Sequence, residues 1–404
     1  MSSLREERKQ LDVVCVSHVD EDHIGGVVRM LEDEVQWRVH DYQRKRGNED
    51  YPAPDAPRPP AIREMWHNGF GDQVGADDEQ VEGMLSQCAR VLTAASSEGL
   101  RGLAQTYRDF ATDAGHGVRL SRRIGPRELD IPLNPPTHGK LMMLRDAERP
   151  ISLGSMSVLV LGPLDSEVES LRKWWRKWLN SAKGSKKVKQ IDEEAGEDED
   201  LLRSAGMARK TRLSQESLRT PEISRVFLAA LTQAEEVGRR SEVSVPNLAS
   251  IVLLVEEAGK TVLLAGDGHA KDICEGLRRN RKLKSGHCHV DILKVPHHGS
   301  EHNLNEDFCK AVTADHYLFC ANGEHQNPDP QIVKLIVDTR LKGSDDRKFK
   351  LWFNSSKAAA QKDRGDADHM SEIQRLVSNL TRKSQGRISS EFLKGPDSFE
   401  LSLS

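Results

Sequence analysis

The stretch LDVVCVSHVDEDHIGG, residues 11–26, indicates both a fold class and a chemistry. Five of its first six residues are apolar and three of them are β-branched, which is typical of a buried strand. The polar segment that follows holds four side chains able to bind a metal ion: His18, Asp20, Asp22 and His23. In an extended segment, alternate side chains point to one side, and a turn at 22–23 would bring the last histidine to the same point. Two imidazoles and two carboxylates gathered in this way need a cation to offset their burial and repulsion.

Two further apolar segments also end in aspartate or histidine. The segment TVLLA, residues 261–265, continues into Asp267, and DILKV, residues 291–295, continues into His297 and His298. Three strands that each deliver such residues at their carboxyl ends predict a metal site at one edge of a buried sheet.

Several other elements follow from local patterns. The two apolar runs in 250–267 surround a Glu-Ala-Gly-Lys turn, which predicts a hairpin. The remaining predicted strands are 151–163 (as a hairpin or two strands), 316–322 and a last strand at 398–403. Helices are predicted at 24–34, at 171–179 and near 370–382, and residues 76–112 also carry helical patterning. Residues 42–61 are predicted as a surface loop, and the charged stretch 181–211 as a disordered or mobile insert.

The segment SHVDEDHIGG resembles the metal-binding signature of the metallo-β-lactamase superfamily, HxHxDH followed by glycines, with Asp20 in place of the second histidine. Together with LLAGD and LKVPHHGS downstream, this HxDxDH variant is similar to the hydrolase-like domain of bacterial competence DNA-uptake proteins. The motifs at 247–250 (NLAS) and 322–328 (NGEHQNP) resemble the same branch. The resemblance covers residues 10–35 and 244–335, with a weaker similarity at 151–163.

The resemblance implies a set of metal ligands. One metal would be bound by His18 and Asp20, a second by Asp22 and His23, and Asp267 would bridge the two metals. The implied cofactor is zinc at two sites, with manganese as an alternative because the ligand set is rich in carboxylates.

The resemblance also assigns roles to histidines later in the chain. His298, rather than His297, takes the place of the final family histidine and completes the metal ligands. His297 would lie in the outer shell or face the substrate, and His297 and His325 are the candidates for protonating a leaving group. The family's mid-chain histidine has no counterpart here, and Asp165 and His138 are only weak substitutes.

The implied fold class is α/β, as an αββα metallo-β-lactamase sandwich. Residues 1–345 are expected to form this domain, with charged inserts at 41–62 and 181–212, and residues 346–404 a C-terminal extension. The family usually has further strands before HxHxDH, whereas about ten residues precede the first strand here. The fold is therefore expected to be incomplete at its N-terminus. A misassigned start, a partner chain that supplies the missing strands and a degraded remnant all remain open.

The expected function is that of a metal-dependent hydrolase that uses a metal-bound hydroxide on a phosphodiester or related ester. Asp22 and Asp267 are the expected catalytic carboxylates. The alternative is a non-catalytic or partner-dependent member of a bacterial accessory or defence system that retains the fold.

Composition limits the partners. Of the 404 residues, 37% are apolar and 30% charged, and the net charge of −4 gives no overall attraction to nucleic acid. A local exception is LRKWWRKWL, residues 171–179, whose basic and tryptophan residues fit either a nucleic-acid surface or, as we favour, a helix packed on the core. The six cysteines lack CxxC spacing. No apolar run approaches the ~18 residues of a membrane span, so we expect a cytoplasmic protein with no membrane contact.

Overall fold

The computed structural model describes residues 10–69, 116–117, 119–145, 149–166, 168–169, 250–343, 345–362, 365–395 and 398–403. The chain divides into two units, and the first consists of Met1–Asn68, Arg122–Glu167 and Pro246–Ser404. Nearly all described residues belong to this first unit. The elements predicted for 76–112, 171–179 and 181–211 lie outside the described residues.

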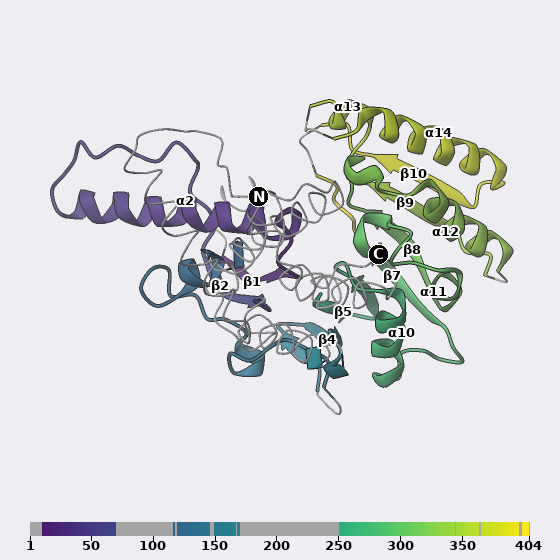
Figure 1. The fold of residues 1–404 in the computed structure, drawn as a ribbon, viewed down its shortest axis with the longest axis horizontal. Coiled ribbons are helices and arrows are strands. Elements are labelled where there is room, and N and C mark those ends of the chain that lie inside the picture. The colour runs from purple at the N-terminus through teal and green to yellow at the C-terminus, as the bar shows by residue number, and fades with distance from the viewer. Residues whose placement is uncertain are drawn as a thin grey trace, which may run out of the picture. The chain divides into compact units, whose positions relative to one another are not determined.

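The first unit is built on an eight-stranded mixed sheet with the order β10-β9-β8-β7-β6-β5-β4-β3 (Figure 1). Its strands are β3 (Ile151–Leu153), β4 (Met156–Gly162), β5 (Val252–Glu257), β6 (Lys260–Leu264), β7 (Cys288–Lys294), β8 (Val312–Phe319), β9 (Phe349–Phe353) and β10 (Ile388–Phe392). Neighbours from β3 to β6 are antiparallel, and neighbours from β6 to β10 are parallel. The prediction of an α/β protein is therefore confirmed, while the αββα order of layers stays a prediction.

Helices pack on one face of this sheet and form the main core with it. They are α10 (Ala270–Arg279), α11 (Glu306–Ala311), α12 (Pro330–Lys342) and α14 (Ala367–Lys383), and the short α13 (Lys357–Ala360) precedes the last of them. In α14, Met370, Ile373 and Val377 are buried at helical spacing, as expected of an amphipathic helix. The helix predicted near 370–382 is thus confirmed.

The opposite face of β4 and β5 packs against a smaller layer. Strands β1 (Leu11–Val16) and β2 (Ile62–His67) pair in parallel as a separate two-stranded sheet. Trp66 of β2 lies in one buried cluster with Val158 and Leu253 of the larger sheet. A backbone hydrogen bond of 2.8 Å from Ile251 N to Ser17 O also ties the end of β1 to the start of β5. The predicted strand at 11–16 is present, but it is not the buried strand expected, because only Val16 of its six residues is buried.

Helix α2 (Glu21–Lys45) is longer than predicted, so the loop after it begins at residue 46 rather than at 42. Its distal half is supported by the returning loop: Trp37 Nε1 donates to Ala56 O at 2.9 Å, and Arg58 pairs with Asp41 at 2.8 Å. These contacts join residues that are distant in sequence. They stabilise the second half of a helix whose side chains are mostly polar.

The C-terminal region also differs from expectation. The prediction of a strand at 398–403 is wrong: these residues form no strand, and the last strand of the described residues is β10, which pairs in parallel with β9. Residues 346–404, expected as an extension, contribute β9, β10 and α14 to the main sheet and its core.

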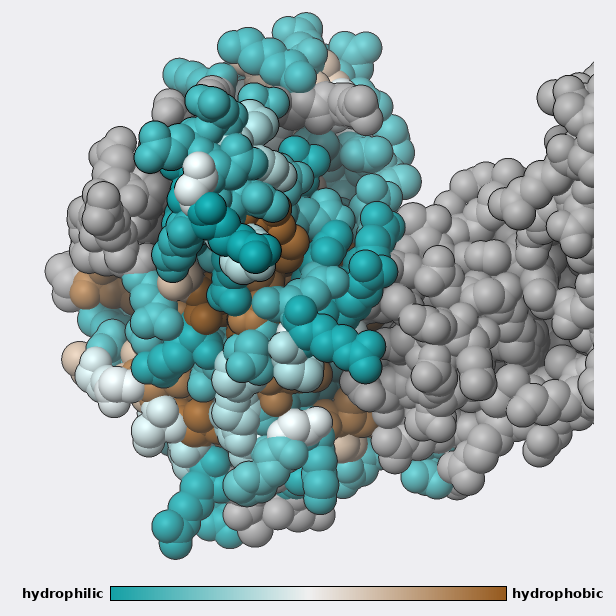
Figure 2. Space-filling view, turned by 90° about the vertical axis from the view of Figure 1, so that its left-hand side faces the viewer, coloured by the Kyte–Doolittle hydropathy of each residue, from teal (hydrophilic) through white to brown (hydrophobic). Residues whose placement is uncertain are grey.

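The surface of the described residues is mainly hydrophilic on the face shown in Figure 2, with hydrophobic side chains in small patches between the polar ones. Only four large apolar side chains of the described residues are exposed: Val39, Tyr42, Met156 and Leu264. Among the described helices, none has the length and apolar character required to cross a membrane.

Candidate metal centre

The first part of the centre is the turn between β1 and α2. Strand β1 ends at Val16, and α2 begins at Glu21 with Asp20 as its N-cap residue. The Asp20 side chain makes no capping hydrogen bond; its Oδ2 lies instead 3.4 Å from His18 Nε2. Asp22 and His23 lie in the first helical turn, so the convergence arises from a strand-to-helix turn and not from the extended run that the sequence predicted.

The second and third parts follow two parallel strands. Strands β6 and β7 pair with Leu264 opposite Lys294, so their carboxyl ends lie at the same edge of the sheet. Asp267 follows β6, and the short 3-10 helix η2 (Pro296–Gly299) follows β7. His297 and His298 both have left-handed backbone conformations, with φ of 44° and 57°. The backbone N–H of His297 donates to Gly266 O at 3.1 Å, which joins the two loops.

Asp267 lies at the middle of the cluster and is 2% exposed. Its Oδ1 is 3.2 Å from His23 Nε2, and its Oδ2 is 3.6 Å from the Nε2 atoms of both His18 and His298. Asp22 contacts two of the same histidines, with its Oδ2 2.9 Å from His298 Nε2 and 3.5 Å from His23 Nε2. The structure therefore brings together all six residues predicted as metal ligands.

These side chains form two overlapping groups that could hold a metal ion. The first is His18, His23 and Asp267, and the second is Asp22, His23 and His298. Within each group the candidate ligand atoms lie within 4.8 Å of one another. The groups share His23, whereas the family resemblance pairs His18 with Asp20 and Asp22 with His23.

Two buried polar atoms of the centre lack a hydrogen-bond partner: His18 Nε2 and Asp20 Oδ1. Buried polar atoms in folded proteins are nearly always satisfied, and each one left unpaired costs about 1–3 kcal/mol. Both atoms are metal-ligand types, and a cation beside them would satisfy both.

The cluster holds Asp267 and Asp22 in the ionised form. Burial acts to raise the pKa of Asp267, but the hydrogen bond to His23 and the nearby Lys294 ammonium hold that pKa well below its usual range. Burial likewise opposes ionisation of Asp22, yet its hydrogen bond to His298 and the charge of His23 lower its pKa to about 2. Chiefly through burial, the pKa of His23 is lowered, which favours the neutral imidazole that binds metals.

An outer ring of polar groups contacts the candidate ligands. Ser17 Oγ lies 3.0 Å from His18 Nδ1 and 3.1 Å from His23 Nδ1, and Ser250 Oγ lies 3.3 Å from His18 Nδ1. Lys294 Nζ donates to Gly266 O at 2.8 Å and lies 3.4 Å from Asp267 Oδ1. His298 Nδ1 is hydrogen-bonded to the carbonyl of Cys320.

Sequence reasoning did not select these outer residues. Ser17 directly precedes His18, and Lys294 lies in the LKVPHHGS motif, so their positions beside ligand residues were the available signal. The buried Asn303 also contacts the centre and was not selected from the sequence. Its Nδ2 donates to Asp267 O at 2.7 Å, and its Oδ1 is hydrogen-bonded to His297 Nδ1.

The other candidates differ in their distance from the cluster. His297 Nε2 lies 3.7 Å from Asp267 Oδ2, so this histidine borders the centre. His325 is exposed on the 3-10 helix η3 (Glu324–Gln326), and within the described part of the chain no ion pair or hydrogen bond joins it to the cluster. The weak substitutes Asp165 and His138 are also exposed and belong to neither metal-binding group.

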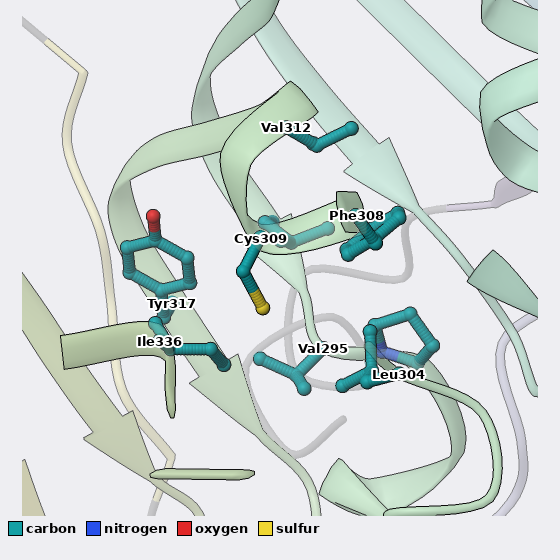
Figure 3. Close-up of a pocket in the computed structure, with 9 residues that line it drawn as sticks. Val295, Leu304, Phe308, Cys309, Val312, Tyr317 and Ile336 are labelled. Carbon is teal, nitrogen blue, oxygen red and sulfur yellow. The ribbon is translucent and has the colours of Figure 1, made fainter. Parts of the chain in front are cut away.

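A separate small hollow lies in the main core beside η2 (Figure 3). Its walls are almost entirely apolar and come from β7, β8, α11 and α12, with Val295, Leu304, Phe308 and Ile336 among them. Neither group of candidate metal ligands lines this hollow, and both groups found among the described residues belong to the cluster around Asp267.

Comparison of the chain with protein-family models, with curated proteins and with solved structures finds no match in any of the three.

Proposed function

We propose that this protein is a metal-dependent hydrolase whose centre is the cluster around Asp267. The observation that carries the proposal is the convergence of three strand ends on one buried carboxylate. Imidazole Nε2 atoms of His18, His23 and His298 lie within 3.6 Å of Asp267. Such a set of imidazole and carboxylate donors is typical of catalytic zinc sites, and its carboxylate content also admits manganese.

The residues present fit a bound cation. Asp267 and Asp22 carry negative charge at neutral pH because their pKa values are lowered. His18 Nε2 and Asp20 Oδ1, which lack hydrogen-bond partners, provide further donors. A divalent cation bound there would supply Lewis-acid activation of water for attack on a phosphorus or carbonyl centre.

The chain's own residues have distinct roles in this proposal. Asp267 orients the three imidazoles, because both of its oxygens contact their Nε2 atoms. His297 is the group proposed to protonate the leaving oxygen: it borders the cluster, and Asn303 fixes its ring through Nδ1. His325, the other candidate for that role, is exposed and lies outside the cluster in the described structure.

The proposed substrate class is a phosphodiester or a related ester. Support for it comes from the resemblance of SHVDEDHIGG, LLAGD and LKVPHHGS to the competence-protein branch of the metallo-β-lactamase superfamily. A small-molecule phosphodiester is preferred over nucleic acid because the net charge of −4 provides no general attraction to a polyanion.

Metal analysis tests the proposal. After extensive dialysis, the purified protein should retain between one and two equivalents of zinc or manganese and should hydrolyse bis(p-nitrophenyl) phosphate. Asp267→Asn should lose most of the metal and the activity. The matched control is Asp346→Asn, because the Asp346 side chain is 93% exposed and belongs to neither metal-binding group. Well-folded protein that binds neither metal would contradict the proposal and favour a non-catalytic role.

A further inference from the structure

The hydroxyl group of Ser17 contacts the Nδ1 atoms of two candidate metal ligands, His18 and His23. Ser17 Oγ lies 3.0 Å from His18 Nδ1 and 3.1 Å from His23 Nδ1. The two imidazole centroids are 4.1 Å apart. Both rings turn their other nitrogen, Nε2, toward Asp267, at 3.6 and 3.2 Å.

Two other segments of the chain, 250–251 and the loop with Gly266, hold Ser17 in place. The carbonyl of Ser17 accepts a hydrogen bond from Ile251 N at 2.8 Å, which anchors it to the start of β5. Gly266, on the loop before Asp267, approaches so closely that a Cβ there would lie 3.1 Å from Ser17 Cβ. The neighbouring Ser250 Oγ also reaches His18 Nδ1, at 3.3 Å, and accepts from the backbone N–H of Asp267 at 3.2 Å.

The hydrogen-bond chemistry of imidazole gives this arrangement a consequence. A neutral histidine carries its proton on one ring nitrogen and a lone pair on the other, and only the lone pair can bind a metal. A hydroxyl oxygen can accept two hydrogen bonds. If Ser17 Oγ accepts an Nδ1–H from each ring, both histidines present Nε2 lone pairs toward the carboxylate of Asp267.

We propose that Ser17 is a positioning residue that holds His18 and His23 together in the tautomer that binds metal. The inference rests on the proposed function, since it assigns the site a cation. Groups that hydrogen-bond the far nitrogen of a metal-binding histidine fix its tautomer and ring orientation, and their loss typically weakens metal binding about 10- to 100-fold. A single hydroxyl shared by two ligands couples both of them to one residue.

Zinc affinity in three proteins tests the inference. Competition with a chromophoric chelator is measured for the wild type, Ser17→Ala and Ser17→Thr. Ser17→Ala should bind zinc about 10- to 100-fold more weakly, whereas Ser17→Thr, which keeps a hydroxyl, should remain within about threefold of the wild type. Thermal unfolding of the zinc-free proteins shows whether the substitutions disturb folding. Equal affinities of the wild type and a folded Ser17→Ala would overturn the proposal.

A second measurement needs no substitution. In zinc-loaded wild-type protein, nitrogen-15 NMR of the imidazoles should show the proton on Nδ1 of both His18 and His23. A proton on Nε2 of either ring would overturn the role of Ser17 even if zinc binds. A wild-type protein that binds neither zinc nor manganese would contradict the proposed function itself, and the inference about Ser17 would be overturned with it.

Discussion

At the scale of single residues, the centre depends on how one buried carboxylate is surrounded. Asp267 Oδ1 faces His23 and Lys294, while its Oδ2 faces His18 and His298. A buried charge without partners costs several kcal/mol, so this carboxylate depends on its neighbours for its ionised form. The same surroundings that lower its pKa also direct both of its oxygens at candidate ligand nitrogens.

The buried His67, at the end of β2, gives a prediction on pH. This histidine is 1% exposed, and burial, assisted by the charge of His18, lowers its pKa to about 4 from the ordinary value of 6.5. Between pH 6.5 and pH 4, the unfolded chain binds a proton at His67 that the native state does not bind. The free energy of unfolding therefore falls as the pH decreases below 6.5. Above pH 6.5 the residue adds no pH dependence. Between pH 7 and pH 5 the loss due to His67 should be about 2 kcal/mol.

His67→Gln should remove that part of the pH dependence. Urea unfolding of metal-free wild type and variant at pH 7 and pH 5 measures the difference, and the other histidines contribute equally to both proteins. The exposed His287 serves as the control position, where His287→Gln should leave the wild-type dependence unchanged. Identical losses of stability in the wild type and His67→Gln would contradict the prediction.

At the scale of elements, the packing of α10 on β4 fixes the loop that carries Asp267. A Cβ at Gly276 of α10 would lie 2.1 Å from the carbonyl oxygen of Leu161, so the helix and strand approach as closely as a glycine allows. The helix begins at Ala270, whose N–H donates to Asn303 O at 2.9 Å, and Asn303 in turn holds the Asp267 carbonyl. A displaced helix would therefore move the candidate metal centre.

Gly276→Ala should destabilise the protein by about 2 kcal/mol, because the helix must move away from β4 to admit a methyl group. The matched control is Gly26→Ala in α2, where a Cβ would meet nothing within 4 Å. That change should stabilise by about 0.5–1 kcal/mol through the higher helix propensity of alanine. Urea unfolding at one pH measures both variants, and a Gly276→Ala protein as stable as the wild type would show that the close approach is unimportant.

Strands were more predictable than helix ends for a physical reason. The hairpin of β5 and β6 has apolar runs around a tight turn, and that information is local. The end of α2 at Lys45 depends instead on contacts with the loop at 56–58, which no local pattern reveals. The β1–β2 pairing joins residues 11 and 62, and it was likewise invisible to periodicity.

At the scale of the whole molecule, the rule that parallel strands end at a common edge foresaw only part of the candidate site, because it applies to β6 and β7, whereas β1 belongs to the separate two-stranded sheet and not to the one sheet that the sequence predicted. Residue types at the ends of β6 and β7 identified Asp267, His297 and His298, and the family resemblance selected His298 as the ligand. The contacts of Ser17 and Asn303 could not be foreseen, since they depend on how the β1 turn and the loop after η2 meet in space. His325 is a residue that the sequence suggested and the structure does not bring into the cluster. Its motif resembles the family, yet its side chain is exposed.

The C-terminal region provides the last prediction, because it completes the main sheet instead of following a finished domain. Phe353 of β9 stacks on Phe319 of β8 with ring centroids 4.7 Å apart, and Phe392 of β10 stacks on Phe353 at 4.3 Å. Ile373 and Val377 of α14 are fully buried in the same core. A chain ending at residue 345 would expose these partners and leave the hydrogen-bonding edge of β8 unpaired.

The truncated chain 1–345 should therefore lose its cooperative thermal transition and aggregate. A chain ending at residue 395 is the control: of the described residues it lacks only 398–403, which form no helix or strand. Its principal loss is the edge contact of Phe399 with Trp352, at 5.0 Å between centroids, so it should unfold cooperatively with a loss of about 1 kcal/mol. Circular dichroism melts distinguish the two. A cooperative transition in 1–345 would mean that β3 to β8 form a stable sheet alone, and that β9, β10 and α14 are an addition to it.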